Sequence, residues 1–88
     1  MYRIEFSPSA ERQLKSLPRE VQVRLKARID ALAEDSRPRG AERLSEAEEY
    51  YRIRAGDYRV IYAIEGRDLI VLVVRVGHRR DVYRRVFR

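Results

Sequence analysis

The sequence predicts an α+β domain in which one sheet carries two helices on a single face. Three observations predict it: an alternating segment at residues 2–6, two amphipathic helical segments between residues 8 and 32, and three strand-like segments between residues 50 and 76. A strand, two helices and an antiparallel meander in this order form one sheet covered on one side. At 88 residues, the chain has the length of one domain spanning residues 1–88.

The first half of the chain predicts a strand followed by a helical hairpin. Residues 2–6 alternate apolar and charged side chains, as a half-buried strand does. Ser7 suits the N-cap of a short helix and Pro8 its first turn. The apolar face of this helix consists of Ala10, Leu14 and Leu17. Pro18 separates it from a longer helix, whose apolar stripe consists of Val21, Leu25, Ile29 and Leu32.

Residues 35–48 lack a clean period, and Pro38 and Gly40 break any helix there. We expect a connecting loop, with Leu44 as its anchor in the core. Three antiparallel strands then follow at residues 50–54, 58–64 and 69–76, joined by turns at 55–57 and 65–68. Gly77 is expected to end the last strand. Residues 79–87 are expected to form a short helix or an extended tail.

All of the net charge lies in the second half of the chain. Residues 1–49 contain ten basic and ten acidic residues, whereas residues 50–88 contain ten arginines and four acidic residues, which gives the net charge of +6. These arginines are interleaved with tyrosines. A positive field with aromatic faces favours RNA or DNA as the partner, and an acidic protein is the alternative.

Composition excludes several classes of protein. The chain has no cysteine, so it has neither a disulfide framework nor a thiolate metal site. The N-terminal residues lack the apolar stretch of a signal peptide, and the longest apolar run, residues 69–74, is far short of the roughly 20 residues that span a bilayer. We therefore expect a cytoplasmic protein that does not act at a membrane.

Strand alternation predicts a basic face. If Tyr51 and Ile53 face the helices, Arg52 and Arg54 project from the opposite side of the sheet. Pairing across the Gly56 turn brings Arg59 near them. His78 and Arg79 are expected just past the end of a neighbouring strand, where they would close this face. The tyrosines of these strands, Tyr50, Tyr51, Tyr58 and Tyr62, are interpreted as core or rim residues.

Two segments of the chain resemble a known family. Residues 51–62 (YRIRAGDYRVIY) and 76–83 (VGHRRDVY) are similar to the RelE branch of the RelE/ParE toxins of bacterial toxin–antitoxin pairs. The opening SPSAERQL at residues 7–14, followed by Leu17 and Pro18, resembles the first helices of that family. The similarity extends over nearly the whole chain, with the same order of elements.

The resemblance implies an mRNA interferase that needs no metal or cofactor. RelE toxins enter the ribosomal A site, where the ribose 2′-OH attacks the adjacent phosphate and leaves a 2′,3′-cyclic phosphate. The implied partners are the ribosome with its mRNA, and an acidic RelB-like antitoxin that neutralises the toxin. With this antitoxin the chain would form a hetero-oligomer, and it would be a monomer when free.

The resemblance also implies roles for single residues. Arg52 and Arg54 stand where well-known members have two lysines, and Arg59 matches an arginine that grips the scissile phosphate. Arg79 matches an arginine on the leaving-group side, and Tyr83 matches a tyrosine that stacks on the nucleotide. Further RNA contacts are expected from Arg80, Arg84 and Arg85.

The identity of the general base is open at this point. Arginine is effectively always protonated, so Arg52 and Arg54 cannot take the role open to lysine. His78 is a candidate because imidazole titrates near neutral pH, at about 6.5 in model peptides. Tyr83 is a second candidate, if the arginines lower its pKa. The third alternative is that positioning and electrostatics suffice without a base.

Other interpretations of the arginines compete with this one. Arg52 and Arg54 could be solvated strand residues, and Arg59 could pair with Asp57 or Glu65, since a lone buried charge is costly. The chain could instead be a ParE-like toxin that inhibits DNA gyrase without nuclease activity, or a module whose basic face only receives an acidic antitoxin.

Overall fold

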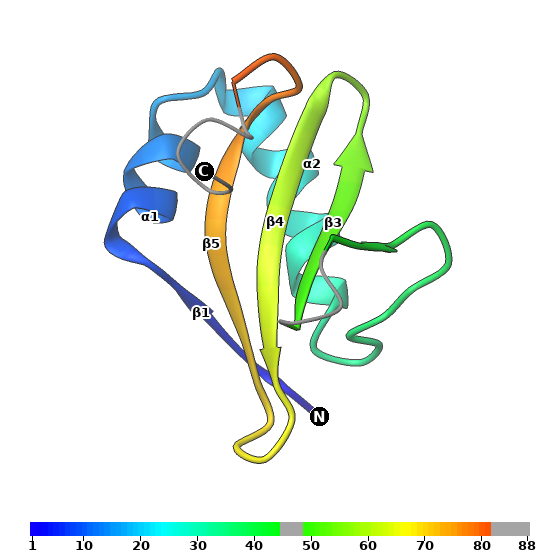
Figure 1. Cartoon of the computed structure of the whole chain (residues 1–88). Helices are drawn as coiled ribbons and strands as arrows, with labels where there is room; N and C mark the ends of the chain where they lie inside the picture. The colour runs from blue at the N-terminus through cyan, green and yellow to red at the C-terminus, as the bar shows by residue number, and fades with distance from the viewer. Residues whose placement is uncertain (45–48, 82–88) are drawn as a thin grey trace.

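The computed structural model describes residues 1–44 and 49–81. Within these residues, five strands form one sheet in the order β1-β5-β4-β3-β2, and both helices lie on one face of it (Figure 1). The elements are β1 (Arg3–Phe6), α1 (Pro8–Lys15), α2 (Arg19–Ala31), β2 (Glu42–Arg43), β3 (Tyr50–Ala55), β4 (Tyr58–Glu65) and β5 (Ile70–His78). The predicted one-sided α+β arrangement is confirmed.

Both helices begin where the sequence predicts. Ser7 caps α1, and its hydroxyl accepts a hydrogen bond from the backbone N–H of Ala10 at 3.1 Å. Pro18 occupies the N-cap of α2, a position at which it makes no side-chain hydrogen bond. The buried side chains of both helices, with that of the α2 C-cap Leu32, pack on the β3–β5 part of the sheet; those of the helices are Ala10, Leu14, Leu25 and Ile29. Val21 and Leu17 lie at the margin of this core.

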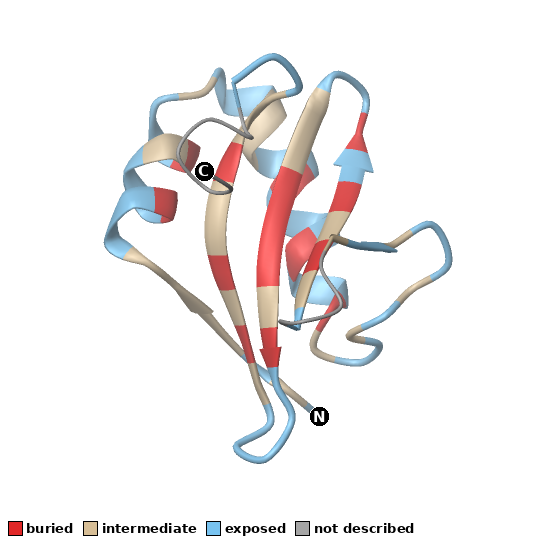
Figure 2. Cartoon of the chain, in the orientation of Figure 1, coloured by how far each residue is buried: buried red, intermediate tan, exposed pale blue. Residues whose placement is uncertain are grey.

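The opposite wall of the core comes from alternate strand residues. Along β3, the residues Tyr51, Ile53 and Ala55 are buried, and the intervening arginines are not (Figure 2). In β4 and β5 the alternation continues with Val60, Tyr62, Ile64, Val71, Val73 and Val76. Tyr51 and Tyr62 are therefore core residues, and Tyr58 packs against the core, as predicted for these tyrosines.

The loop predicted at residues 35–48 contains a short strand. Glu42 and Arg43 form β2, which pairs antiparallel with β3, so the prediction of a connecting loop was wrong at these two residues. Two residues give too short a pattern for sequence periodicity to detect, and the pairing is with a strand that follows later in the chain. Leu44 is half-buried, outside the core cluster, and its backbone N–H donates to the carbonyl oxygen of Tyr50 at 2.9 Å.

Strand β5 extends further than predicted and is irregular in the middle. Gly77 and His78 pair with Arg59 and Tyr58, so Gly77 does not end the strand. Tyr62 pairs with Val73 and Ile61 with Arg75, which leaves Val74 as the extra residue of a β-bulge. The bulge shifts the alternation, so that Val73 and Val76, three residues apart, both face the helices.

β1 pairs in parallel with only the first half of β5, and contacts from Ser7 and α1 follow beyond the end of β1. Beyond Phe6, the Ser7 hydroxyl donates to the carbonyl oxygen of Val74 at 3.3 Å, and the Gln13 side chain accepts from the backbone N–H of Val76 at 2.8 Å. These contacts provide hydrogen-bond partners for the Val74 carbonyl and the Val76 N–H at the edge of β5 that β1 does not cover. None of the described helices is long and apolar enough to cross a membrane.

Candidate nucleic-acid interface

Arg52, Arg54 and Arg59 project from the face of the sheet that the helices leave open. Arg54 and Arg59 are register partners on β3 and β4, and Arg59 in turn pairs with Gly77 on β5. Arg52 lies two residues along β3, in a row with Ile61 and Arg75. Cross-strand partners share one side of a sheet, so these two rows lie on the same side, and Ile61 in the second row is fully buried there. The predicted grouping of these three arginines is confirmed.

The Arg59 guanidinium is held by backbone oxygens and not by a carboxylate. Its Nη1 donates to the carbonyl oxygens of Gly56 and Tyr58 at 2.8 and 3.0 Å. Among the described residues, neither of the two predicted acidic partners, Asp57 and Glu65, pairs with it. Gly56 has φ +62, a left-handed conformation that favours glycine, and so it shapes the turn that presents these carbonyls. Arg59 therefore keeps its full positive charge in a fixed position.

Arg52 has a different environment. Its guanidinium forms an ion pair with Glu42, its register partner on β2. The side chain of Arg52 is only 21% exposed, whereas that of Glu42 is 59% exposed. Arg54 is exposed, and the structure gives it neither a hydrogen bond nor an ion pair with the described residues. The open face thus combines an arginine paired to a carboxylate with two that carry uncompensated charge.

His78 does not lie where the sequence predicted. It is the last residue of β5 and pairs with Tyr58, whose ring packs against the core on the helix side. Partners share a side, so His78 emerges opposite to Arg54 and Arg59, and the expectation that it closes the arginine face was wrong. Its ring meets Tyr58 edge-on, with centroids 5.8 Å apart. Strand β5 continues through Gly77 and His78, two residues beyond its predicted end, and strand alternation then places His78 on the helix side of the sheet.

The hydrogen bonding of His78 also limits its chemistry. The Nδ1 atom accepts the backbone N–H of Arg80 at 3.2 Å. A neutral imidazole has one donor and one acceptor nitrogen, so this bond places the proton on Nε2. In this tautomer the free Nε2 of His78 is a hydrogen-bond donor.

Arg79 is tied to the same turn as Arg59. Its backbone N–H donates to the carbonyl oxygen of Asp57 at 2.7 Å, and its Nε lies 3.8 Å from the Asp57 carboxylate. On the helix side of this turn, Arg24 of α2 places Nη1 3.4 Å from where a Cβ on Gly56 would lie. Three arginines from separate elements therefore surround the β3–β4 turn.

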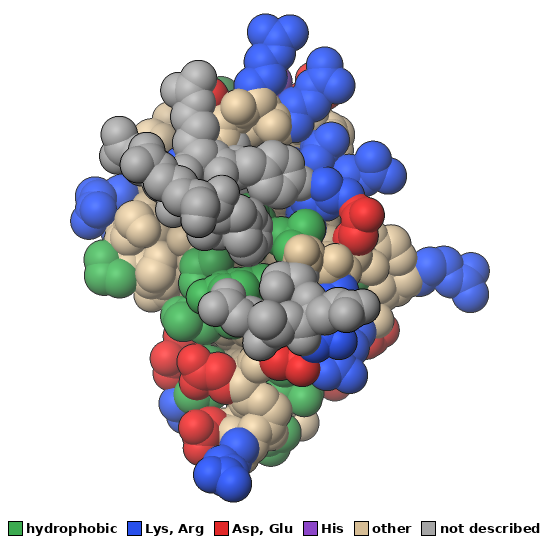
Figure 3. Space-filling model, in the orientation of Figure 1, with side chains coloured by type: hydrophobic (Ala, Val, Ile, Leu, Met, Phe, Trp, Pro, Cys, Tyr) green, Lys and Arg blue, Asp and Glu red, His purple; other side chains and the backbone are tan. Residues whose placement is uncertain are grey.

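The C-terminal part of the predicted site is only partly described. Arg80 is exposed and belongs to the turn after β5. Tyr83, Arg84 and Arg85 lie outside the described residues. In the space-filling view from the open side, Lys and Arg side chains gather toward the end of the sheet that carries the β3–β4 turn (Figure 3).

Two residues of the open face were missed by sequence reasoning. Arg75 interrupts an apolar strand, and its Nε is buried without a hydrogen-bond partner among the described residues. A lone arginine in such a strand is the signal that could have identified it. Glu42 gave no signal, because its place beside Arg52 depends on the unpredicted strand β2.

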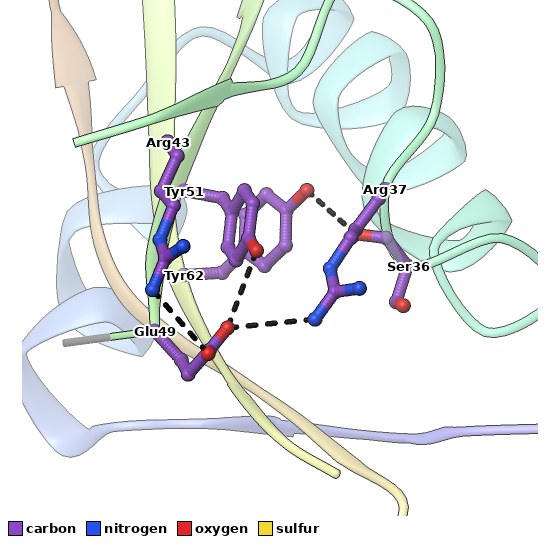
Figure 4. A network of polar contacts seen from close by, with 6 residues as sticks. All are labelled: Ser36, Arg37, Arg43, Glu49, Tyr51 and Tyr62. Carbon is purple, nitrogen blue, oxygen red and sulfur yellow. Dashed lines mark hydrogen bonds and ion pairs between the residues drawn. The ribbon is translucent and has the colours of Figure 1, made fainter. Parts of the chain in front are cut away.

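A polar network holds the segment before β2 and the residue before β3 together (Figure 4). The Glu49 carboxylate accepts the Tyr51 hydroxyl at 3.2 Å and pairs with Arg37 and Arg43, each at 3.5 Å. Tyr62 donates its hydroxyl to the carbonyl oxygen of Ser36 at 2.8 Å and stacks on Tyr51, with centroids 5.9 Å apart. The network fixes both ends of the connection that carries Glu42.

Burial raises the pKa of one member of this network, Tyr62. Burial in the core is the main cause that raises the pKa of Tyr62 above its ordinary value, and the nearby Tyr51 and Asp35 add to it. The guanidinium of Arg37 acts in the opposite direction and is outweighed. The Tyr62 phenol therefore keeps its proton and remains a donor to Ser36 well into the alkaline range.

The structure is that of a small α+β protein with arginines on the open face of its sheet, and comparison with known proteins shows the family to which it belongs. The family profile described as "ParE toxin of type II toxin-antitoxin system, parDE" matches residues 4–83. Toxin RelG of Mycobacterium tuberculosis is 31% identical over 85 residues, which cover 96% of this chain and 98% of that toxin. Putative toxin RelE1 of Methanocaldococcus jannaschii is 27% identical over 86 residues, which cover 94% and 96%.

Solved structures agree with these matches. The toxin–antitoxin complex RelBE2 of Mycobacterium tuberculosis gives a TM-score of 0.76 at 26% identity, over 88% of this chain and 96% of that one. The archaeal RelE–RelB complex of Pyrococcus horikoshii gives 0.76 at 27% identity, over 92% and 98%. Isolated RelE of E. coli has the same fold, with a TM-score of 0.80 at 24% identity over 89% and 84%. This chain belongs to the RelE/ParE superfamily of toxins of type II toxin–antitoxin systems.

Proposed function

We propose that this toxin is a ribosome-dependent endonuclease that cleaves mRNA in the ribosomal A site. The observation that carries the proposal is the cross-strand pair of Arg54 and Arg59, which has no carboxylate partner among the described residues. Like charges directly opposite each other destabilise a sheet. A phosphate bound between them would replace this repulsion with attraction to both guanidinium groups.

The proposed reaction is an in-line attack by the ribose 2′-oxygen on the adjacent phosphorus. The O2′–P bond forms, the P–O5′ bond breaks, and the products are a 2′,3′-cyclic phosphate and a 5′-hydroxyl. Negative charge develops on the non-bridging oxygens, where fixed guanidinium donors stabilise it. Arg54 and Arg59 take this role, and Arg52 orients the groups beside them.

The remaining residues contribute to binding and positioning. We assign Arg79 to the leaving-group side, because it is tied to the turn that also holds Arg59. Tyr83 would stack on the nucleotide, and Arg80, Arg84 and Arg85 would contact phosphates along the strand. His78 orders the turn after β5 through the Arg80 N–H and is not the base in this scheme.

We further propose that an acidic RelB-like antitoxin neutralises the toxin by covering the arginine face. The structures of relatives are complexes with RelB antitoxins, and the uncompensated charge of Arg54 and Arg59 favours an acidic segment. Such a segment would fold as it binds. The toxin would then be a hetero-oligomer with its antitoxin and a monomer when free.

A ParE-like activity is the second candidate, favoured by the description of the family profile that matches residues 4–83. It would act by inhibiting DNA gyrase without cutting RNA. The arginine face is not required for phosphodiester chemistry in that case. Inhibition of supercoiling by the purified toxin, with mRNA left intact, would support this alternative.

The two candidates are separated by mapping mRNA ends after brief induction of the toxin. We expect new ends within translated reading frames for the wild type, and their loss for Arg59→Ala. Arg67→Ala is the matched control, because Arg67 is an exposed arginine in the β4–β5 turn at the opposite end of the sheet. Growth arrest without new mRNA ends, or ends that persist in Arg59→Ala, would contradict the proposal.

A further inference from the structure

We propose that Glu42 is the group that accepts the proton of the attacking 2′-hydroxyl. This inference rests on the proposed nuclease function and supplies the base that the sequence left open. It follows from the position of strand β2, which brings a carboxylate to the edge of the arginine rows.

The register fixes the side of the sheet on which Glu42 lies. Glu42 and Arg52 are cross-strand partners, so both project from the open face that also carries Arg54 and Arg59. The ion pair with Arg52 holds the carboxylate in place beside the arginine rows. With 59% of its side chain exposed, Glu42 remains accessible to a substrate.

No other described acidic residue has this combination of position and access. Glu5 and Glu65 share the open face, but they pair with Leu72 and Ile70 toward the opposite end of the sheet. Asp57 lies in the β3–β4 turn beside Arg79. Glu49 accepts hydrogen bonds from three side chains of the polar network, which are Arg37, Arg43 and Tyr51.

The other candidate bases among the described residues are less suitable. An arginine holds its proton at any pH at which the protein is folded. The acceptor nitrogen of His78 is taken by the Arg80 N–H, and its ring lies on the helix side. A carboxylate beside a guanidinium is a pairing able both to remove the proton and to stabilise the charge that follows.

The proton of the 2′-hydroxyl moves to a carboxylate oxygen of Glu42 as the O2′–P bond forms. The P–O5′ bond breaks, and the leaving oxygen takes a proton from water. Glu42 then returns its proton to solvent, so the enzyme is restored and no metal, oxidant or other co-reactant is consumed.

A purely electrostatic role for Glu42 predicts the opposite result on mutation. If the carboxylate only neutralises Arg52, its removal makes the open face more positive, and both substrate affinity and cleavage should rise. If it accepts the proton, its removal should lower the rate of cleavage while affinity is kept or raised. The direction of the change in rate therefore separates the two roles.

The test uses ribosome-bound mRNA under single-turnover conditions, with the toxin affinity for programmed ribosomes measured in parallel. For Glu42→Gln, which preserves shape and an acceptor for Arg52, we expect a rate at least about 100-fold lower with unchanged or tighter affinity. Glu42→Asp, which restores a carboxylate, should recover part of the rate. Glu5→Gln is the matched control, since Glu5 is also an open-face glutamate paired with an arginine, at 2.8 Å from Arg3, and it should cleave normally.

Wild-type cleavage with an equal or faster rate for Glu42→Gln would overturn the inference and leave the nuclease function standing. The inference would also be overturned if Glu42→Asp cleaved as slowly as Glu42→Gln while keeping the melting temperature of the wild type. Absence of cleavage by the wild type itself would overturn both proposals.

Discussion

Arg54 and Arg59 lie directly opposite each other on β3 and β4, on the face of the sheet that the helices leave open. Arg59 is fixed to the carbonyl oxygens of the adjoining turn, and Arg54 is exposed beside it. Repulsion between these like charges lowers the stability of the free toxin, and the pair becomes favourable only when an anion binds to it. The arrangement thus couples a cost in stability to the proposed function.

Arg54→Thr should stabilise the fold and impair the activity together. Threonine suits a strand and removes the cross-strand repulsion, so the free energy of unfolding should rise by about 0.2–1 kcal/mol. Cleavage of ribosome-bound mRNA should fall at least tenfold. Urea unfolding and a cleavage assay measure the two effects. A variant that is less stable than the wild type would show that Arg54 has a structural role.

Replacing His78 tests whether it takes part in proton transfer. His78→Phe keeps an aromatic ring against Tyr58 and removes both nitrogens. We expect cleavage within about tenfold of the wild-type rate, because loss of a general base costs roughly 100-fold or more. A loss of that size, in a variant that melts like the wild type, would make His78 the base after all.

The stability of the toxin should fall in alkaline solution because of Tyr62. Its pKa is raised in the folded state, mainly by burial, so folding favours the protonated phenol. This contribution is complete below the unfolded pKa of about 10 and is lost as the pH rises above it, by up to about 1.4 kcal/mol per pH unit.

Urea unfolding between pH 9 and 11 measures this dependence. Tyr62→Phe should be less stable at pH 7 by about 1 kcal/mol, through loss of the hydrogen bond to Ser36. Its free energy of unfolding should fall less steeply than that of the wild type as the pH rises above about 10. Parallel curves for the two proteins would contradict the argument.

Binding of an acidic antitoxin to the arginine face should depend strongly on salt. Exposed charges such as Arg54 are screened as the Debye length shortens from about 10 Å at 0.1 M salt to about 3 Å at 1 M. We expect the affinity of the toxin for its antitoxin to fall steeply up to about 0.5 M salt, as measured by titration calorimetry. Affinity that does not change over this range would indicate an apolar interface instead.

Much of the fold could be predicted because it depends on local patterns. Helix spacing, the Ser7 cap and the alternation around Tyr51 each identify an element within a short window. The exceptions depend on distant pairing. Strand β2 exists only through its contact with β3, and the bulge at Val74 only through the register with β4.

The same limit applies to the candidate site. The side of Arg54 and Arg59 followed from alternation across a tight turn, which is a local rule. His78 was misplaced because the end of β5 is set by pairing with Tyr58, beyond a glycine that was expected to stop the strand. Glu42 could not be predicted, since no local pattern places it beside Arg52.

In the proposed function, the toxin cleaves mRNA on the ribosome through the 2′-hydroxyl and the arginine face. The most direct measurement uses purified ribosomes programmed with an mRNA that carries either ribose or 2′-deoxyribose at the cleaved nucleotide. We predict a product ending in a 2′,3′-cyclic phosphate for ribose with the wild type, and none for 2′-deoxyribose or for Arg59→Ala. Intact ribose-containing mRNA, or cleavage of the 2′-deoxy substrate at the same rate, would contradict the account.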